Sequence, residues 1–232
     1  MTGEYIAATR TSYDAVAAAY ADQLSDELRR KPLDRALLSA FAEQVRAVTP
    51  AQAPAAGPGH TQAVGPGRPR VWDVGCGPGH VTAFLAGLGL DAAGIDLSPG
   101  MIDEARRRHP GLAFTVGSMT ALDDVIAEPV DGLVAWYCVI HVPPSEHREL
   151  YAGFRRVLKP GGHLLLAFQH GDSRRQITEA YGHSGLRLDA YRLPPERVEA
   201  DLAEAGFAHV ARLTRAPIGP EKVPQAYVIA RA

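Results

Sequence analysis

Apolar positions follow two different patterns along the chain. From residue 12 to 47 they recur every three or four residues, as in "SYDAVAAAYADQL" and "LDRALLSAFAEQV". This spacing predicts helices, with Ser12 as the first N-cap. From residue 70 onward, short apolar runs alternate with amphipathic stretches. Such an order is typical of a parallel sheet with helices on both faces.

The second pattern can be divided into elements. The predicted strands cover residues 70–74, 91–95, 112–116, 130–136, 162–168, 207–214 and 225–230. The predicted helices cover residues 79–88, 99–108, 144–157 and 195–205, the last ended by Gly206. The final two strands are expected to form an antiparallel pair. The predicted fold is therefore α/β, a doubly wound, mostly parallel, seven-stranded sheet.

The segment "TPAQAPAAGPGHTQAVGPGRP" at 49–69 is dense in Pro, Gly, Ala and Gln. It has little apolar surface to bury and is predicted to be an exposed, flexible linker. The helices before it are too few to form a core, so the chain is predicted to be one domain. Its expected parts are a helical cap at 1–48, the linker, a core at 70–168, a substrate-side segment at 169–193 and a C-terminal helix and strand pair at 194–232.

Composition narrows the class of protein. The chain has 232 residues, of which 46% are hydrophobic and 22% charged, as in ordinary globular domains. The net charge of −2 and the short basic pairs give no stripe for nucleic acid. No apolar run is long enough to span a membrane, and no secretory segment is recognisable. We therefore expect a cytoplasmic monomer or homodimer without nucleic-acid or membrane partners.

Cysteine usage agrees with a reduced compartment. Cys76 and Cys138 are the two cysteines, and both lie near predicted strand ends far apart in the sequence. Two cysteines alone make neither a disulfide framework nor a metal site. We expect no metal in this protein.

The stretch "VWDVGCGPGH" is a strand that breaks into a turn containing Gly75, Gly77 and Gly79, with Asp73 just before it. Glycine turns of this kind let backbone approach a nucleotide. In the dinucleotide fingerprint a third glycine or alanine falls five residues after the first, and here that position is His80. The spacing therefore departs from the nicotinamide-binding pattern.

This stretch resembles the first motif of the class I S-adenosylmethionine (SAM) dependent methyltransferases. The order of elements through residue 168 and the final strand pair is also similar to that family. The resemblance implies a Rossmann-like methyltransferase fold and SAM as the cofactor. It further implies that the three glycines let backbone approach the methionine end of SAM, and that Asp73 positions the amino group or orders the loop.

Asp96 ends "AAGIDLS", where the resemblance implies a carboxylate that accepts both ribose hydroxyls. The alternative is an N-cap for the helix that begins at Pro99, with Ser98 as a rival for that role. Leu97 and Met101 would flank the adenine, although plain core packing is an equal alternative for Met101.

The adenine edge is expected at "FTVGSMTAL". Many relatives have Asp at the position of Ser118, where the hydroxyl or the backbone amide of Met119 would serve here. In "VDGLVAWYCVIHVPP", Ala135 is expected near the methionine moiety and His141 in the loop facing the substrate. Val142 stands before the Pro-Pro pair, which disfavours the branch that methylates amino groups of nucleic acids and glutamine.

Methyl transfer from a sulfonium requires mainly alignment and desolvation. A base is needed only when the acceptor arrives protonated, and His141 is the first candidate, with support of the substrate wall as its alternative role. His170, after the strand at 162–168, is the second candidate. Tyr13 and Tyr20 share a helix face and would cap SAM or simply pack that helix on the sheet.

The predicted function is methylation of an oxygen or nitrogen of a small molecule. Two other functions stay open from the sequence. One is methylation of a peptide or protein end, which would need an open groove. The other is a non-catalytic SAM-binding module, which would need no acceptor cavity.

Overall fold

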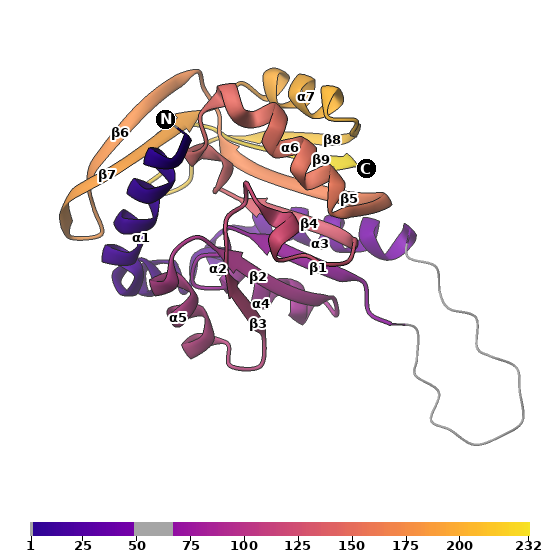
Figure 1. Ribbon diagram of the computed structural model, residues 1–232, viewed down its shortest axis with the longest axis horizontal. Helices are drawn as coiled ribbons and strands as arrows, with labels where there is room; N and C mark the ends of the chain where they lie inside the picture. The colour runs from indigo at the N-terminus through magenta and orange to yellow at the C-terminus, as the bar shows by residue number, and fades with distance from the viewer. Residues whose placement is uncertain (1, 49–66) are drawn as a thin grey trace, which may run out of the picture.

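The computed structural model describes residues 2–48 and 67–232 (Figure 1). The helices are α1 (Thr2–Leu24), α2 (Glu27–Arg30), α3 (Pro32–Val48), α4 (His80–Gly87), α5 (Pro99–Arg108), α6 (His147–Arg156) and α7 (Pro195–Glu204), with 3-10 turns η1 (Leu122–Asp124), η2 (Val139–His141) and η3 (Pro144–Glu146). The strands are β1 (Arg70–Val74), β2 (Asp91–Asp96), β3 (Ala113–Val116), β4 (Val130–Trp136), β5 (Leu158–Gln169), β6 (Ser173–Ala180), β7 (His183–Arg192), β8 (Ala208–Arg215) and β9 (Gln225–Arg231). Residues 49–66 of the predicted linker at 49–69 lie outside the described residues.

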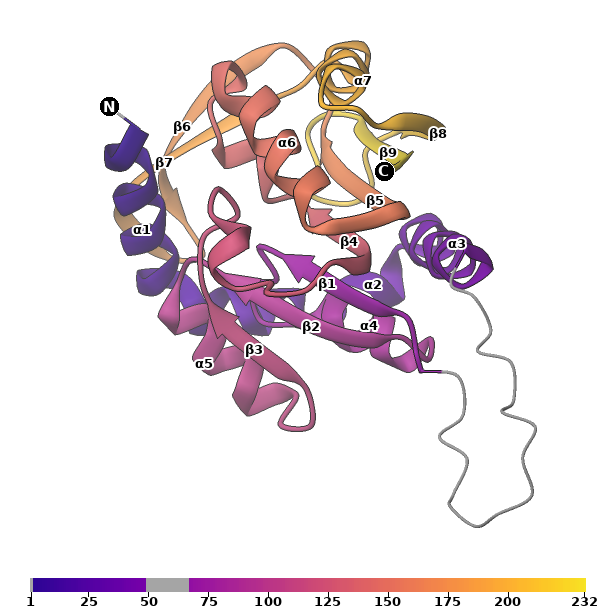
Figure 2. The ribbon, with the colours of Figure 1, turned by 45° about the vertical axis from the view of Figure 1, so that its right-hand side comes forward.

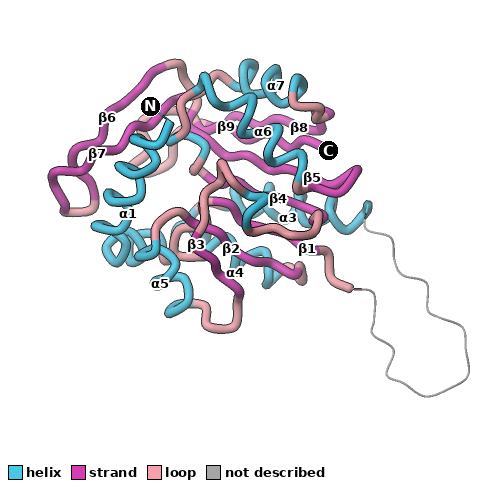
Figure 3. The backbone as a smooth tube through the Cα atoms, in the orientation of Figure 1, coloured by secondary structure: helices cyan, strands magenta, loops and turns pink. Residues whose placement is uncertain are grey.

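The strands form a seven-stranded sheet in the order β3-β2-β1-β4-β5-β9-β8 (Figure 3). Neighbouring strands run parallel from β3 to β5, and β9 runs antiparallel to both β5 and β8. This confirms the predicted doubly wound sheet and its C-terminal antiparallel pair. The chain order reverses between β1 and β4, and ligands of open α/β sheets bind at the carboxyl ends of such a pair.

Helices cover both faces of the sheet. On one face, α3 and α4 bury Phe41 and Leu85 against β1, β4 and β5, while on the other α6 and α7 bury Phe154 and Leu202. Strand β4 is buried along its whole length, which accounts for the apolar run from Leu133 to Trp136. Helix α3 is thus part of the core. Of the helices in the predicted cap 1–48, α1 is the one that lies over the carboxyl edge of the sheet.

The β6–β7 hairpin forms a second, two-stranded sheet that projects from the end of β5 beside α1 (Figures 1 and 2). Its two-residue turn has positive φ at both central positions, Tyr181 (54°) and Gly182 (78°), as the twist of a tight hairpin requires. The sequence analysis predicted no strands here, although Leu186, Leu188 and Ala190 alternate with polar residues along β7 and are buried, because β6 is polar and largely exposed.

The expected N-cap role of Ser12 is wrong. Helix α1 begins at Thr2, which places Ser12 in the helix interior. Its hydroxyl instead accepts a hydrogen bond of 3.0 Å from the backbone N–H of Arg187 in β7. Ser12 therefore joins α1 to the hairpin.

Candidate active site

Three adjoining cavities lie at the carboxyl edge of the sheet, beneath α1 and the hairpin. Their volumes are about 280, 70 and 40 Å³, and all three are lined by Gly75 and His141. Because they share these lining residues, the three cavities are together called the cleft. The cleft is lined by most of the residues that the sequence singled out, namely Tyr13, Tyr20, Asp73, Gly75, Gly77, Asp96, Leu97, Met101, Ser118, Met119 and His141.

Asp73 is a buried acid at the end of β1. Its Oδ2 accepts a hydrogen bond of 2.6 Å from the Thr82 hydroxyl, while its Oδ1 is buried without a hydrogen-bond partner among the described residues. Burial raises the pKa of the Asp73 carboxyl to about 6, against the opposing effect of Thr82. An unpaired acceptor at this position favours a ligand that brings a donor or a positive charge.

Asp96 ends β2 and also lines the cleft. Its Oδ2 accepts from the Gly77 N–H at 2.8 Å, and its Oδ1 accepts from the Ser98 N–H at 2.9 Å. Burial raises the pKa of this carboxyl to about 6, although both backbone hydrogen bonds lower it. The N-cap of α5 is Ser98, whose hydroxyl accepts from the Met101 N–H, so the N-cap alternative for Asp96 is excluded.

The three glycines of the turn have different roles. The N–H groups of Gly75 and Cys76 both donate to the carbonyl of Ile95, which folds the turn over the end of β2. Gly75 and Gly77 have φ of 68° and 52° and line the cleft. Gly79 does not line it, contrary to expectation. A Cβ there would lie 2.7 Å from the Phe114 ring, so Gly79 permits close packing of α4 against β3.

These groups suit SAM. A carboxylate has about four lone-pair positions, so Asp96 keeps acceptor capacity for a pair of ribose hydroxyls beyond its two backbone donors. The unpaired Oδ1 of Asp73 suits the ammonium of the methionine moiety. Beyond Asp96 the narrowest cavity is lined by Leu97, Ser118 and Met119, as expected for a site that holds a flat ring.

His141 is 8% exposed and held at both ring nitrogens. Its Nδ1 lies 2.7 Å from the carbonyl oxygen of Asp189 in β7, and its Nε2 lies 2.6 Å from the Tyr13 hydroxyl in α1. A carbonyl only accepts, so Nδ1 carries the proton and Nε2 of the neutral ring accepts from Tyr13. Burial lowers the pKa of His141, which keeps it neutral near pH 7.

Aromatic rings from α1 and the hairpin close the cleft. Tyr13 and Tyr20 meet edge to face with centroids 5.9 Å apart, and Tyr20 meets Tyr181 of the hairpin turn at 4.9 Å. Burial raises the pKa of both α1 tyrosines far above the usual range, so their hydroxyls stay protonated. The predicted cap is therefore an aromatic one.

Besides Gly79, two predicted site residues do not line the cleft. Side chains alternate along a strand, so at the end of β5 it is Gln169 that reaches the cavity, while His170 pairs with Leu193. Ala135 packs in the core formed with α6 and α7. The next residue of β4, Trp136, lines the cleft instead, and its buried Nε1–H has no partner among the described residues.

The sequence analysis missed the residues that enclose the far end of the largest cavity. They come from segments distant in sequence, namely Glu27 and Lys31 of α2 and its C-terminus, Arg175, Ile177, Ala190 and Arg192 of the hairpin, and Glu221 and Lys222 before β9. One unusual backbone conformation lies in the same region. Tyr137 adopts φ of 57°, a conformation that bulky residues rarely take and that is common near functional sites.

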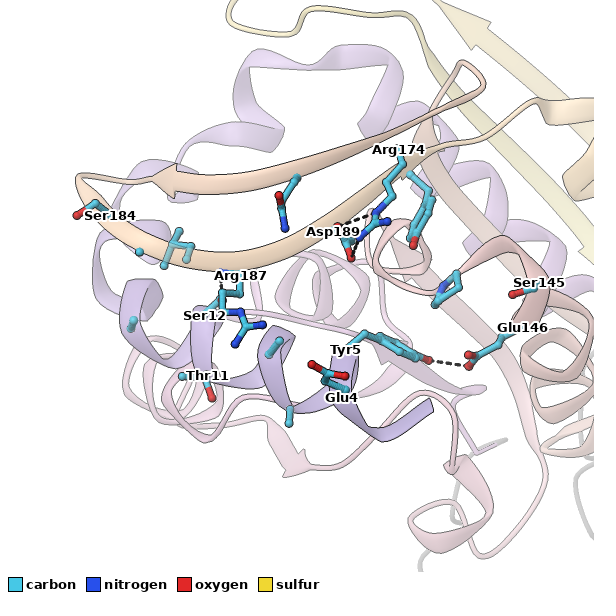
Figure 4. A pocket seen from close by; sticks show the side chains of 18 residues that line it. Glu4, Tyr5, Thr11, Ser12, Ser145, Glu146, Arg174, Ser184, Arg187 and Asp189 are labelled. Atoms are coloured by element: carbon cyan, nitrogen blue, oxygen red, sulfur yellow. Dashed lines mark hydrogen bonds and ion pairs between the residues drawn. The ribbon is translucent and has the colours of Figure 1, made fainter. Parts of the chain in front are cut away.

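A larger groove, of about 960 Å³, lies between α1 and the outer face of the hairpin (Figure 4). Its lining includes Tyr5, Glu146, Arg174 and Asp189 but none of the glycine-turn residues. Size alone therefore does not mark the site, because the buried acids and unpaired donors gather in the smaller cleft.

Two classes of site are not found in the part of the chain that the structure describes. Within residues 2–48 and 67–232, no helix is both long and apolar enough to cross a membrane. The same residues contain no group of three or more His, Cys, Asp or Glu side chains placed to hold a metal ion.

Comparison with known proteins connects this geometry to a family. Residues 71–162 match the methyltransferase domain family. A trans-aconitate 2-methyltransferase of Methylobacterium nodulans is 41% identical over 99 residues, which cover 42% of this chain and 37% of that protein. A demethylmenaquinone methyltransferase of Renibacterium salmoninarum is 37% identical over 114 residues, 47% of each chain. The chain thus spans less than half the length of these curated relatives.

Solved structures agree on the fold over a longer stretch. The crystal structure of Burkholderia thailandensis 1,6-didemethyltoxoflavin-N1-methyltransferase, with bound 1,6-didemethyltoxoflavin and S-adenosylhomocysteine, aligns with a TM-score of 0.70 at 20% identity. The alignment covers 100% of this chain and 90% of that one. The family match over residues 71–162, the methyltransferase relatives and the shared fold together support a class I S-adenosylmethionine-dependent methyltransferase.

Proposed function

We propose that the protein transfers a methyl group from SAM to an oxygen or nitrogen of a small molecule. The observation that carries this proposal is the adjacency of the cavities. The cavity lined by Asp96 and Gly77 shares Trp136 and His141 as a wall with a cavity of about 280 Å³, which is near the size of small-molecule sites. A binding module without catalysis has no need of this second chamber. The relatives described above are named for methylating small molecules, which supports the same class of acceptor here.

SAM supplies a methyl group on a sulfonium, which reacts by in-line displacement. The chain's own contribution is alignment and the exclusion of water. Asp96 orients the ribose through its remaining acceptor positions, and Asp73 holds the ammonium beside the glycine turn. Tyr13, Tyr20 and Tyr181 cover the reacting region and keep water out. Positioning of this kind can contribute about 7–11 kcal/mol toward the barrier.

A protonated acceptor must also lose a proton. Because Nδ1 of His141 is bonded to the Asp189 carbonyl, only Nε2 can take a proton, and the Tyr13 hydroxyl occupies it. We therefore assign His141 as a base that acts through Tyr13. The Tyr13 oxygen accepts the acceptor's proton as its own proton passes to Nε2, which leaves Tyr13 neutral and His141 cationic. This route avoids a tyrosinate, which burial disfavours.

Turnover of a panel of small molecules with methyl-labelled SAM tests the proposal. The expected result is label on an oxygen or nitrogen of at least one compound, with S-adenosylhomocysteine formed in equal amount. Saturable SAM binding without transfer to any compound would instead favour the non-catalytic module. Label transferred only to peptides would favour the peptide-end function, for which the outer groove (Figure 4) is the open surface at hand.

A further inference from the structure

The two faces of the β6–β7 hairpin carry different charges. Directly opposed residues share a face, as in the pairs Arg175↔Ala190 and Arg174↔Tyr191. Arg175, Ala190 and Arg192 line the cleft, whereas Arg174, Asp189 and Tyr191 line the outer groove. The hairpin is therefore a wall between two spaces, and its charges can be compared face by face.

On the outer face the positive charge is neutralised within the hairpin. The guanidinium of Arg174 donates two hydrogen bonds, of 2.9 and 2.8 Å, to the carboxylate of Asp189 (Figure 4). On the inner face, neither Arg175 nor Arg192 has a side-chain hydrogen bond or ion pair with any residue in 2–48 or 67–232. The Nε–H of Arg192 is moreover buried without a partner.

A third cation completes the inner set. Lys222, in the segment before β9, lines the same cavity and also has no side-chain partner in the described part of the chain. Arg175 and Arg192 are diagonal neighbours on one face of the hairpin, at a separation that long side chains can bridge. Arg175 and Lys222 are exposed to solvent and Arg192 is half-buried, so an anion that binds between them would relieve the mutual repulsion of three like charges.

The two glutamates of this cavity, Glu27 and Glu221, do not provide that negative charge, because each is already paired with a cation. Lys31 lies 2.5 Å from Glu27 and 2.8 Å from Glu221, and Arg215 lies 2.5 Å from Glu221. Burial opposes the ionisation of both glutamates, yet His80 and Lys31 lower the pKa of Glu27 to about 2, and Arg215 and Lys31 lower that of Glu221 to about 2. Their charges are thus present but already compensated.

Unsatisfied groups are therefore segregated along the cleft. At the end assigned to SAM, the Oδ1 of Asp73 is a hydrogen-bond acceptor without a partner among the described residues. At the hairpin end, the Nε–H of Arg192 is a donor without a partner there, and the Trp136 Nε1–H lies between the two. We propose that the methyl acceptor is a molecule that carries an oxyanion, a carboxylate or a phosphate, and that Arg175 and Arg192, with Lys222 at the rim, hold this group while another oxygen or nitrogen is methylated. Guanidinium groups match the planar, two-oxygen geometry of such anions. This inference rests on the proposed function, because it identifies the molecule that carries the bound anion as the acceptor.

Three probes that share one ring test the site directly. Benzoate, phenyl phosphate and neutral benzamide are titrated by calorimetry into the protein loaded with S-adenosylhomocysteine. At least one anion is expected to bind about tenfold or more tighter than benzamide, and comparison of the two anions separates a carboxylate site from a phosphate site. Arg192→Gln and Arg175→Gln should each remove most of that preference without changing the affinity for S-adenosylhomocysteine.

Arg174→Gln is the matched control, since it removes a cation from the adjacent position on the opposite face of the same strand. It should leave the preference for anions unchanged. Equal binding of all three probes, no binding of any, or an equal loss in Arg174→Gln would overturn the inference. Anion binding without methyl transfer to any compound would leave the anion site standing while the proposed function fails. Methyl transfer to neutral compounds alone would support the proposed function and contradict the anion site.

Discussion

The two ends of the cleft are built from different parts of the fold and carry opposite unsatisfied groups. The cofactor half is Asp73, Gly75, Gly77 and Asp96, and the acceptor half is Arg175, Arg192 and Lys222. The cofactor half comes from the ends of two adjacent parallel strands, and its Asp73 Oδ1 is an acceptor without a partner in the described part of the chain. The acceptor half comes from the hairpin and the segment before β9, and its Arg192 Nε–H is a donor without a partner in that same part.

The difference teaches how each half is held in place. In the cofactor half Asp73 is 1% exposed, Gly75, Gly77 and Asp96 are half-buried, and the turn is tied to Ile95 by two backbone hydrogen bonds. The acceptor half stands on a two-stranded ribbon that contacts α1 and η2. A rigid half suits a cofactor shared by a whole family, while a half carried by a hairpin can change with the acceptor.

The strongest test concerns the proton route that joins the two halves. Tyr13→Phe removes the hydroxyl that contacts Nε2, and His141→Ala removes the base. Each variant should lower kcat for a protonated acceptor by about 10²–10⁴-fold, and the double variant should lose little more, because the two groups act as one unit. Single-turnover assays with labelled SAM measure the effect.

Tyr5→Phe is the control, because Tyr5 is on the same helix but bonds to Glu146 at the outer groove. It should retain near-normal kcat. If Tyr13→Phe raised only the acceptor KM, the pair would support the wall and His141 would not be the base.

A second test removes an acceptor from the cofactor half. Asp96→Ala should weaken binding of S-adenosylhomocysteine by about 1.5–3 kcal/mol, since it deletes hydrogen bonds to a charged group. Calorimetry measures this, and wild type should bind neither NAD(H) nor NADP(H). Asp91→Ala, at the exposed amino end of the same strand, should bind normally. Binding of nicotinamide dinucleotides in place of SAM would contradict the assignment of the cofactor half.

A third test uses the raised pKa of Asp73, about 6 against an ordinary 3.8. A raised pKa means that this side chain favours the folded state at low pH and loses that contribution as pH rises through 6. Asp73→Asn stays neutral throughout. The variant should therefore gain unfolding free energy relative to wild type, by about 1–3 kcal/mol, between about pH 4 and pH 7.

Urea unfolding without ligand at several pH values gives this difference, and the contributions of other groups cancel in the subtraction. Asp123→Asn, an exposed partner of Arg156, should show no such trend. The same Asp73→Asn variant should bind S-adenosylhomocysteine more weakly than wild type. If the difference in unfolding free energy between the two proteins does not change with pH, the pKa of Asp73 is not raised in the folded state.

The smallest expected effect concerns the attachment of the hairpin. Ser12→Ala removes the hydrogen bond to the Arg187 N–H and should cost about 0.5–1.5 kcal/mol of stability. It should raise the acceptor KM a few-fold and leave S-adenosylhomocysteine affinity unchanged. Ser25→Ala is the comparison, because that hydroxyl bonds within its own exposed turn. A loss of cofactor affinity in Ser12→Ala would contradict the independence of the two halves.

Much of the cofactor half was predictable from local sequence. The run "VWDVGCGPGH" combines a buried strand with a glycine turn, and "AAGIDLS" ends the next strand with an acid, so strand pairing alone brings Asp73 and Asp96 to one edge. The exceptions follow from packing and strand geometry. Gly79 contacts Phe114 of β3, and the side chains of Ala135 and His170 face away from the cleft.

The chain's own pattern was enough to specify the doubly wound, mostly parallel sheet, its C-terminal antiparallel strand pair and the acids of the cofactor half. The reason is that periodicity and glycine turns are local and the right-handed crossover rule leaves few topologies. The acceptor half was decided by tertiary structure, since α1, the β6–β7 hairpin and the segment before β9 meet only after folding. Charges such as Arg174 and Arg175 are adjacent and identical in the sequence, and only the placement of the hairpin makes one an ion-pair partner and the other a free cation in the cleft.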